Sequence, residues 1–174
     1  MSCDITGGRT EPCKDSVGGL KNIYIINYSA TLLSGATVDA NDQITDLASA
    51  VVAYKFELKG ANTFDEANEN SRDNGTSFWT GTGTIVLKKQ DLTTQKEFKL
   101  LSYGRPQILI EDYNGNFRLA GAENGCEVSV NTASGAGMGD LNGYTLTFTS
   151  TESAMANFVD SAIVGASLDF NVTA

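Results

Sequence analysis

The chain has 174 residues, of which 41% are apolar and 19% charged, and its formal net charge is −9. This balance is typical of one globular domain rather than of a disordered chain. The sequence contains no histidine, which excludes Ser-His-Asp and Cys-His catalysis and histidine-held metal ions. The acidic charge argues against sequence-specific reading of nucleic acid, although an acidic wall would let a polyanion pass without sticking.

Glycine and threonine dominate the pattern of the chain. Eighteen glycines against two prolines, with abundant threonine and asparagine, indicate many tight turns between short strands. We therefore expect a mainly β (α+β) fold, an antiparallel β-sandwich or small barrel, in a single structural domain over residues 1–174.

The first 21 residues are predicted to form an irregular, extended N-terminal arm, because they are polar and show little periodicity. Cys3 and Cys13 lie in this arm and either pair across a short loop or stay reduced. Cys126 is in phase with Val128 and Val130, so we expect it to be a small buried residue. No segment has the apolar run of a signal peptide or a membrane span, which predicts no membrane partner and production in the cytoplasm.

Three segments in the first half of the chain indicate strands, and one indicates a loop. The continuous apolar run Ile23–Tyr28 is typical of a strand buried on both faces. Residues 50–59 alternate, which predicts a half-buried strand with Tyr54, Phe56 and Leu58 on one face. Residues 60–83 combine turn-formers and acids with aromatic residues, so we expect a long loop that orders against a neighbouring subunit or packs on its own domain. Residues 84–89 are predicted to form another strand.

One short helix is predicted near residues 92–102. Thr94 and Glu97 match a capping box, good helix formers follow, and Gly104 and Pro106 end the segment.

The segment Ile108–Glu152 contains three Asn-Gly pairs among alternating apolar and polar residues. Since Asn-Gly readily takes positive φ at both central positions of a type I′ turn, we expect a β-meander. Its inner side chains, at a period of two, are predicted to be Phe117, Leu119, Cys126, Val128, Val130, Tyr144, Leu146 and Phe148. Thr145, Thr147 and Thr149 would form the opposite face of the last strand, and residues 166–172 a closing strand.

No motif predicts catalytic, cofactor-binding or metal-binding residues. Asp39-x-Asn41-x-Gln43 lacks the glycine and the glutamate of an EF-hand loop. The glycine-rich run from Gly135 to Asp140 lacks the lysine and the helix of a phosphate-binding loop. The carboxylate pairs Glu111-Asp112 and Asp65-Glu66 are neighbours on predicted strands or loops, so the two members would point apart. We therefore expect a protein that is not an enzyme and needs no cofactor.

Two segments resemble structural proteins of tailed-bacteriophage virions. They are Cys3–Tyr28 and Gly139–Glu152, the second preceded by Gly121–Gly125. Within that class, the order of elements is most similar to a tail tube protein: strands, one central helix, then a meander. The resemblance implies hexameric rings that stack into a conduit for DNA, with other virion proteins as partners and assembly in the host bacterial cytoplasm. The Cys3/Cys13 arm departs from what is expected of tube proteins in general.

The tube interpretation assigns the arm (residues 2–21) and residues 60–83 to contacts between subunits, since rings need their strand edges covered by neighbours. Two alternatives remain open. One is a head–tail connector, neck or capsid decoration protein. The other is a surface carbohydrate-binding β-sandwich, for which Phe78-Trp79 is the candidate aromatic pair.

Overall fold

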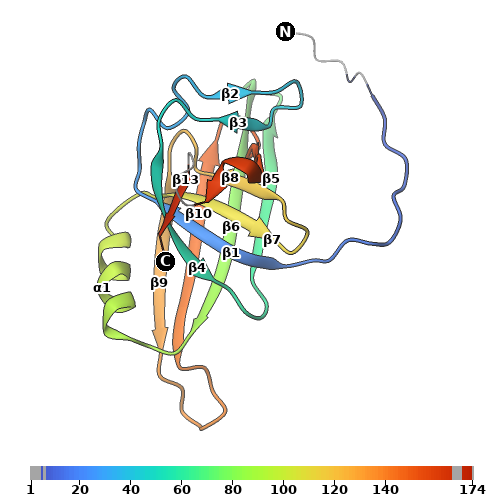
Figure 1. Cartoon of the computed structure of the whole chain (residues 1–174). Helices are drawn as coiled ribbons and strands as arrows, with labels where there is room; N and C mark the ends of the chain where they lie inside the picture. Colours follow the sequence, from blue (N-terminus) through green and yellow to red (C-terminus); the bar gives the residue numbers. More distant parts are fainter. Residues whose placement is uncertain (1–4, 6, 166–169, 174) are drawn as a thin grey trace.

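Two β-sheets packed face to face, with one helix beside them, make up the fold (Figure 1). The structure is a computed structural model, and it describes residues 5, 7–165 and 170–173. The predicted class, mainly β with one helix in a sandwich, is confirmed. Residues 5 and 7–19 form no helix or strand and extend away from the two sheets, as expected for the arm (Figure 1).

The larger sheet, sheet A, has nine strands in the order β12-β13-β4-β1-β7-β8-β11-β3-β2. Its fourth strand, β1, is buried on both faces, as predicted, with Ile23 and Ile25 on one side and Tyr24 and Ile26 on the other. In chain order the strands are β1 (Leu20–Ile26), β2 (Thr37–Val38), β3 (Ile44–Asp46), β4 (Val51–Glu57), β7 (Gln107–Asp112), β8 (Phe117–Ala120), β11 (Phe158–Val159), β12 (Val164–Gly165) and β13 (Phe170–Thr173). A 3-10 turn, η1 (Ser161–Ile163), lies between β11 and β12.

The smaller sheet, sheet B, has four antiparallel strands in the order β5-β6-β10-β9. Their bounds are β5 (Thr63–Ser71), β6 (Thr76–Lys88), β9 (Cys126–Ala133) and β10 (Gly143–Glu152). Cys126, Tyr144, Leu146 and Phe148 are buried on its inner face, which confirms the predicted period of two.

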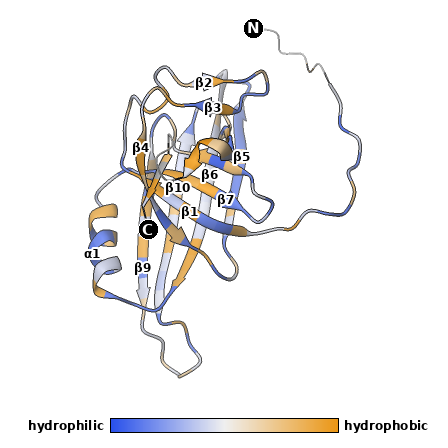
Figure 2. Ribbon diagram, viewed as in Figure 1, coloured by the Kyte–Doolittle hydropathy of each residue, from blue (hydrophilic) through white to orange (hydrophobic). Residues whose placement is uncertain are grey.

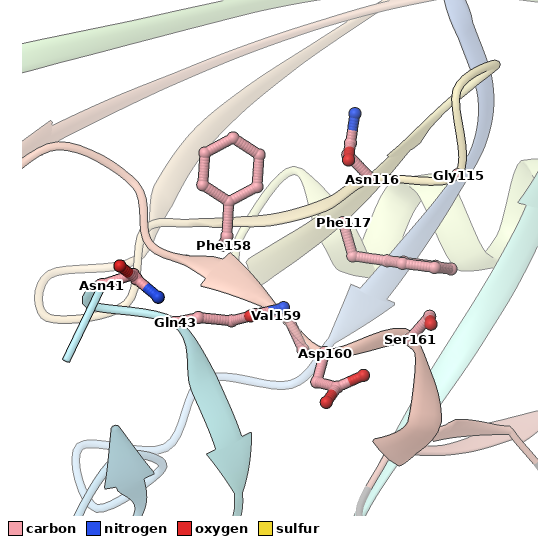
Figure 3. A pocket seen from close by; sticks show the side chains of 9 residues that line it. All are labelled: Asn41, Gln43, Gly115, Asn116, Phe117, Phe158, Val159, Asp160 and Ser161. Atoms are coloured by element: carbon pink, nitrogen blue, oxygen red, sulfur yellow. The ribbon is translucent and has the colours of Figure 1, made fainter. Parts of the chain in front are cut away.

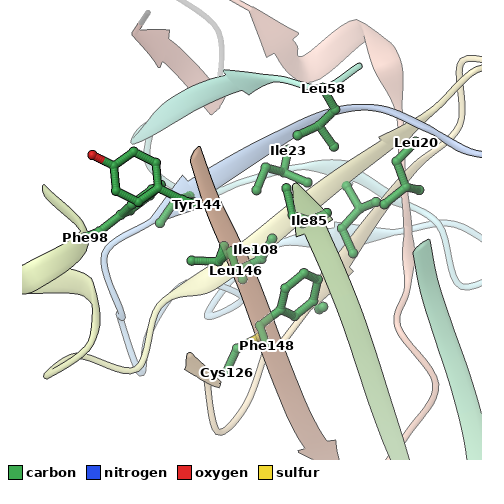
Figure 4. Close-up of a cluster of buried hydrophobic side chains, with 13 residues drawn as sticks. Leu20, Ile23, Leu58, Ile85, Phe98, Ile108, Cys126, Tyr144, Leu146 and Phe148 are labelled. Atoms are coloured by element: carbon green, nitrogen blue, oxygen red, sulfur yellow. The ribbon is translucent and has the colours of Figure 1, made fainter. Parts of the chain in front are cut away.

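The main core fills the space between the two sheets (Figure 4). Ile23 and Ile108 from sheet A meet Ile85, Leu146 and Phe148 from sheet B. A second apolar cluster covers the other face of sheet A, where β3, β11 and the 31–48 region fold over Tyr24, Leu109 and Leu119. Sheet A is therefore buried on both faces, whereas sheet B is buried on one.

Residues 60–83 do not form a long loop, which corrects that expectation. Most of them belong to the β5–β6 hairpin, in which nine residue pairs run from Thr63↔Thr84 to Ser71↔Thr76. The turn is only four residues long, and Gly75 supplies its positive φ of 64°. Cross-strand pairing along the whole hairpin outweighs the low strand propensity of its Asp and Asn residues.

Helix α1 (Leu92–Leu101) confirms the predicted helix, but its N-cap is Asp91 rather than Thr94. The Asp91 carboxylate accepts hydrogen bonds from the backbone N–H groups of Thr93 and Thr94, and from the Thr94 hydroxyl. An aspartate just before the helix pairs two backbone N–H groups of the first helical turn. A cap at Thr94 would have left these two groups without a partner.

The Asn-Gly pairs do not form type I′ turns, and the expected meander is divided between the sheets. Gly115 and Gly125 have positive φ, but the asparagines before them do not. The β7–β8 hairpin lies in sheet A and the β9–β10 hairpin in sheet B. Asn124-Gly125 stands where the chain crosses from one sheet to the other, so this pair makes no hairpin.

Strand β4 also differs in part from the prediction. Phe56 and Leu58 pack on the main core, but Tyr54 is 44% exposed, and Ala53 of the opposite face is fully buried. Both faces of β4 therefore contribute to packing, because the second cluster covers the other side of sheet A. Of the predicted closing strand, Phe170–Thr173 is β13, and residues 166–169 lie outside the described residues.

Candidate functional site

The outer face of sheet B is polar and carries hydroxyl, amide and carboxylate groups. The strand register places Thr80, Thr82 and Thr84 of β6 beside Thr151, Thr149 and Thr147 of β10. The flanking strands add further outer-face residues to the same rows: Thr63, Asp65, Ala67, Glu127, Ser129 and Asn131. Among these described rows no lysine or arginine occurs. Rows of hydroxyls and a few carboxylates offer a polyanion no cation to bind, and Lys88 extends this face only at the end of β6.

Both edges of sheet B are long strands that no other described strand pairs with. β5 has nine residues and β9 has eight, and each has one neighbour in the sheet. In Figure 2, β5 is mostly blue, from its acids and amides, while much of β6 and β10 is pale. Unpaired edges of this length are templates for pairing with another chain. Sheet A, by contrast, ends in the two-residue strands β12 and β2.

Glycines on the inner face fix how closely sheet B packs on the core. A Cβ at Gly83 would lie 2.2 Å from the ring of Phe148, which stacks on Phe64 with centroids 5.9 Å apart. A Cβ at Gly81 would lie 2.6 Å from the Ser150 hydroxyl. The strand thus alternates glycine inside with threonine outside, and the phenyl rings take the space of the missing side chains.

The root of the N-terminal arm is fastened to the β7–β8 turn. Asn114 accepts a hydrogen bond from Val17 N–H at 2.9 Å and donates one to the Val17 carbonyl at 2.7 Å. The Asp112 carboxylate orders this turn by accepting from the backbone N–H groups of Asn114 and Asn116. Asn114-Gly115, expected only to reverse the chain, therefore also sets the point where the arm leaves the domain.

A buried carboxylate lies next to this root. Glu111 accepts hydrogen bonds from Lys21, Asn22 and Tyr24, each 2.6 Å long. Burial alone would raise the pKa of Glu111, but these three donors outweigh it and lower the pKa below its ordinary value. Burial and the bond to Glu111 raise the pKa of Tyr24. Every oxygen of this carboxylate has a donor, so the cluster joins β1 to β7 instead of presenting a free base.

Two hollows lie along sheet A. A groove of about 630 Å³ lies over the Glu111 cluster, lined by Lys21, Tyr24, Lys59 and Tyr113 among others. A smaller one of about 350 Å³ lies between β8, β11 and the loop before β3 (Figure 3). Its side chains, as Figure 3 shows, include amides, one carboxylate and two phenyl rings: Asn41, Gln43, Asn116, Phe117, Phe158 and Asp160. In the groove the Glu111 carboxylate accepts hydrogen bonds from Lys21 and Tyr24, and in the smaller hollow Asp160 stands next to Ser161.

The motifs set aside on sequence grounds have structural roles. Asp39 accepts from the backbone N–H groups of Asn41 and Gln43 and so closes its own loop. Asp140 accepts from Ala136 and Gly137 N–H groups, which are therefore not free to hold a phosphate. These bonds lower the pKa of Asp140.

The carboxylate pairs are separated, as their strand positions predicted. Asp65 lies on the outer face of β5, while Glu66 points inward and accepts from Ala156 N–H at 2.9 Å. The second oxygen of Glu66 lies 4.0 Å from the Arg118 guanidinium. Glu111 and Asp112 likewise have different partners. Glu66 and Glu111 each line a hollow without the carboxylate that stands next to them in the sequence.

Cys126 is buried, as predicted, and burial raises the pKa of its thiol to about 12. Cys13 is exposed, and Cys3, its possible partner, lies outside the described residues. In the described part of the chain no group of three or more Cys, Asp or Glu side chains is placed to hold a metal ion.

The candidate aromatic pair Phe78-Trp79 does not make one platform. The two residues are consecutive on β6, so Phe78 points to the outer face of sheet B and Trp79 to the inner face. Both are half-buried. A carbohydrate would thus meet one ring at a time.

Sequence reasoning predicted the threonine face of β10 but missed its continuation over β5 and β6 and the open edges of sheet B, because it assigned residues 60–83 to a loop. A signal was present: threonines at 80, 82 and 84 alternate with glycines at 81 and 83, in step with threonines at 145, 147 and 149.

No described helix is long and apolar enough to cross a membrane. Comparisons with protein-family models, with curated proteins and with solved structures gave no match, so the candidate site is interpreted from the geometry of this chain.

Proposed function

We propose that the protein is a non-enzymatic structural subunit of a tailed-bacteriophage virion, and that its rings stack into a tail tube that conducts DNA. One observation carries the proposal: sheet B is fixed to the core by one face, is open at both long edges, and presents rows of hydroxyls and carboxylates on its other face, with Lys88 at one end. We expect further copies of the chain to extend such a sheet by pairing with its open edge strands.

Continuation by like copies would place β9 of one subunit against β5 of the next. Neighbouring strands of sheet B alternate in direction, so this contact is also antiparallel and joins two different surfaces head to tail. A head-to-tail contact closes into a ring when its rotation permits. Six copies of a four-stranded sheet would give a barrel of 24 strands. Barrels of about 16–18 strands already leave an aqueous channel, so this ring would be open at its centre.

The outer face of sheet B would line that channel. Its threonines would offer DNA neutral hydroxyls, and Asp65, Glu69 and Glu127 would repel phosphate. The N-terminal arm, fastened at Val17 and otherwise extended, would reach a neighbouring subunit.

Negative-stain electron microscopy of the purified protein tests the proposal directly. Stacked rings support a tail tube, whereas single rings or capsid-bound particles support the connector, neck or decoration alternative. Protein that stays monomeric at every concentration would reject assembly through sheet B.

A disulfide trap identifies the edges involved. In a Cys3→Ser/Cys13→Ser background, Ala67→Cys on β5 and Ser129→Cys on β9 should together give a ladder of disulfide-linked species on a non-reducing gel. Each single-cysteine variant is the matched control and should stop at the dimer. A ladder that forms equally well without one of the two cysteines would contradict edge pairing.

A further inference from the structure

The four strands of sheet B pair without any stagger. Their three ladders run without a register shift, so that Thr63, Thr84, Thr147 and Ser129 lie in one level row across the sheet. A closed barrel needs a stagger, because its strands tilt by about 35–45° relative to the barrel axis. In a ring of copies, the whole stagger must therefore come from the contact between β9 of one subunit and β5 of the next.

The lengths and positions of the two edge strands favour one register for that contact. Without a slip, residues 126–129 of β9 would face residues 63–66 of β5, and the rest of both edges would stay unpaired. A slip of four residues brings Ala133 opposite Thr63 and pairs all eight residues of β9 with residues 63–70. Slips of two or six residues leave part of β9 beyond an end of β5, and odd slips would exchange the two faces of the sheet.

The same slip closes a barrel of ordinary geometry. Applied at each of six contacts in a barrel of 24 strands, it gives a shear of about 24 residues. With about 3.3 Å per residue along a strand and about 4.8 Å between strands, the strands then tilt by about 35°. A slip of two residues would halve the shear and give a tilt of about 20°, which is below the usual range.

The direction of the slip agrees with the twist of β-strands. Seen from the side of sheet A, which would be the outside of the ring, β9, β10, β6 and β5 follow from left to right (Figure 1). The slip displaces the subunit that joins β9 toward the end of the sheet where the 134–142 loop lies, at the bottom of this view. Bringing all subunits to one height then tilts the strands from lower left to upper right. This is a right-handed coil, the sense that right-handed strand twist favours.

We infer that β9 of one copy pairs with β5 of the next in this slipped register, with Ser129 opposite Ala67 and Asn131 opposite Asp65. The inference rests on the proposed ring and specifies the pairing that would hold it together. The Asn131 carboxamide and the Asp65 carboxylate are both exposed in the described structure, and across this contact the first would donate to the second. One pair in this register is unfavourable, because Glu127 would face Glu69, and like charges directly opposite weaken a strand pair.

Disulfide trapping distinguishes the registers. In the Cys3→Ser/Cys13→Ser background, Ser129→Cys with Ala67→Cys should give a ladder of linked species, because directly opposite positions have Cβ atoms about 4.5–5.5 Å apart. Ser129→Cys with Thr63→Cys is the matched control. It should give no ladder, since the two cysteines would be separated by four residues, about 13 Å along the strand. An unslipped register would reverse the two results.

Charge removal on β5 gives a second measurement. Glu69→Gln removes the like-charge pair with Glu127 and should lower the protein concentration needed for assembly about twofold or more in sedimentation. Asp65→Asn removes one carboxylate from the same face and should give no such gain, because Asp65 faces Asn131. In an unslipped ring the outcomes would be exchanged, since Asp65 would then face Glu127.

Failure of the register and failure of the tube proposal give different results. If rings or tubes form but the ladder comes from Ser129→Cys/Thr63→Cys, or from neither pair, the slipped register is wrong while the tube proposal stands. If the unmodified chain stays monomeric and neither pair gives a ladder, the tube proposal fails, and the register with it.

Discussion

Sheets A and B differ in how many of their faces are covered and in the length of their edge strands. Sheet A is covered on both faces, and its edges are strands of two residues. Sheet B is covered on one face, and its edges are strands of nine and eight residues. Short edges resist unwanted pairing, and long open edges invite it.

From this difference we expect sheet A to contribute most of the stability of the fold, and the outer face and edges of sheet B to be the part left open to partners. Strands β1 and β7 of sheet A contribute side chains to both apolar clusters, so their loss should affect the whole domain. The outer face of sheet B contributes to neither cluster through its threonines. Substitutions there should alter assembly much more than stability. The following predictions test that division.

The largest loss of stability is expected in the doubly covered sheet. Leu109 is fully buried in the second cluster, and Leu109→Ala should lower the free energy of unfolding by about 3 kcal/mol. Urea denaturation followed by circular dichroism measures it. Val52→Ala, at a position 46% exposed, is the control and should cost well under half as much. Equal losses at both positions would contradict the second core.

A somewhat smaller loss is expected on the inner face of sheet B. Gly83→Ala places a methyl group 2.2 Å from the Phe148 ring, which must move, at a cost of about 2 kcal/mol. Thermal unfolding should show a clearly lower Tm. Gly139→Ala is matched, because no atom lies within 4 Å of its Cβ position, and its Tm should be unchanged.

A pH-dependent loss of similar or smaller size is expected at the buried carboxylate. Glu111→Gln weakens the bonds from Lys21, Asn22 and Tyr24 and should cost about 2 kcal/mol near neutral pH. Because the pKa of folded Glu111 is lowered from 4.5, its stabilisation is present above that pH and is lost as the pH falls through the lowered value.

Unfolding measured from pH 7 to pH 3 checks this dependence. The difference between Glu111→Gln and the original chain should shrink toward acid. Glu57→Gln, whose carboxylate is exposed, is the control and should change little at any pH. A difference for Glu111→Gln that stays constant down to pH 3 would contradict the assigned direction.

The smallest effect on stability is expected on the outer face of sheet B. Thr147→Val should change the free energy of unfolding by less than about 0.5 kcal/mol, because the side chain contacts neither core. Its neighbour Leu146, which points inward and is fully buried, provides the contrast as Leu146→Ala, with an expected cost of about 3 kcal/mol. Similar costs at the two positions would remove the distinction between the faces.

The sequence by itself determined the elements whose pattern is local. The apolar run at β1, the period of two in β10, the burial of Cys126 and the presence of α1 all follow from side chains near one another in the chain. Such patterns show whether one face or both faces of a strand or helix meet an apolar environment. They do not depend on which other element provides that environment.

Only the tertiary structure decided which strands are neighbours and what remains open. Residues 63–71 read as a loop because Asp, Glu and Asn disfavour strands, yet pairing with β6 makes them an edge. The meander became two hairpins because Gly121 and Gly125 carry the chain from one sheet to the other. The polar face and the open edges of sheet B depend on contacts between distant residues, which no local pattern specifies.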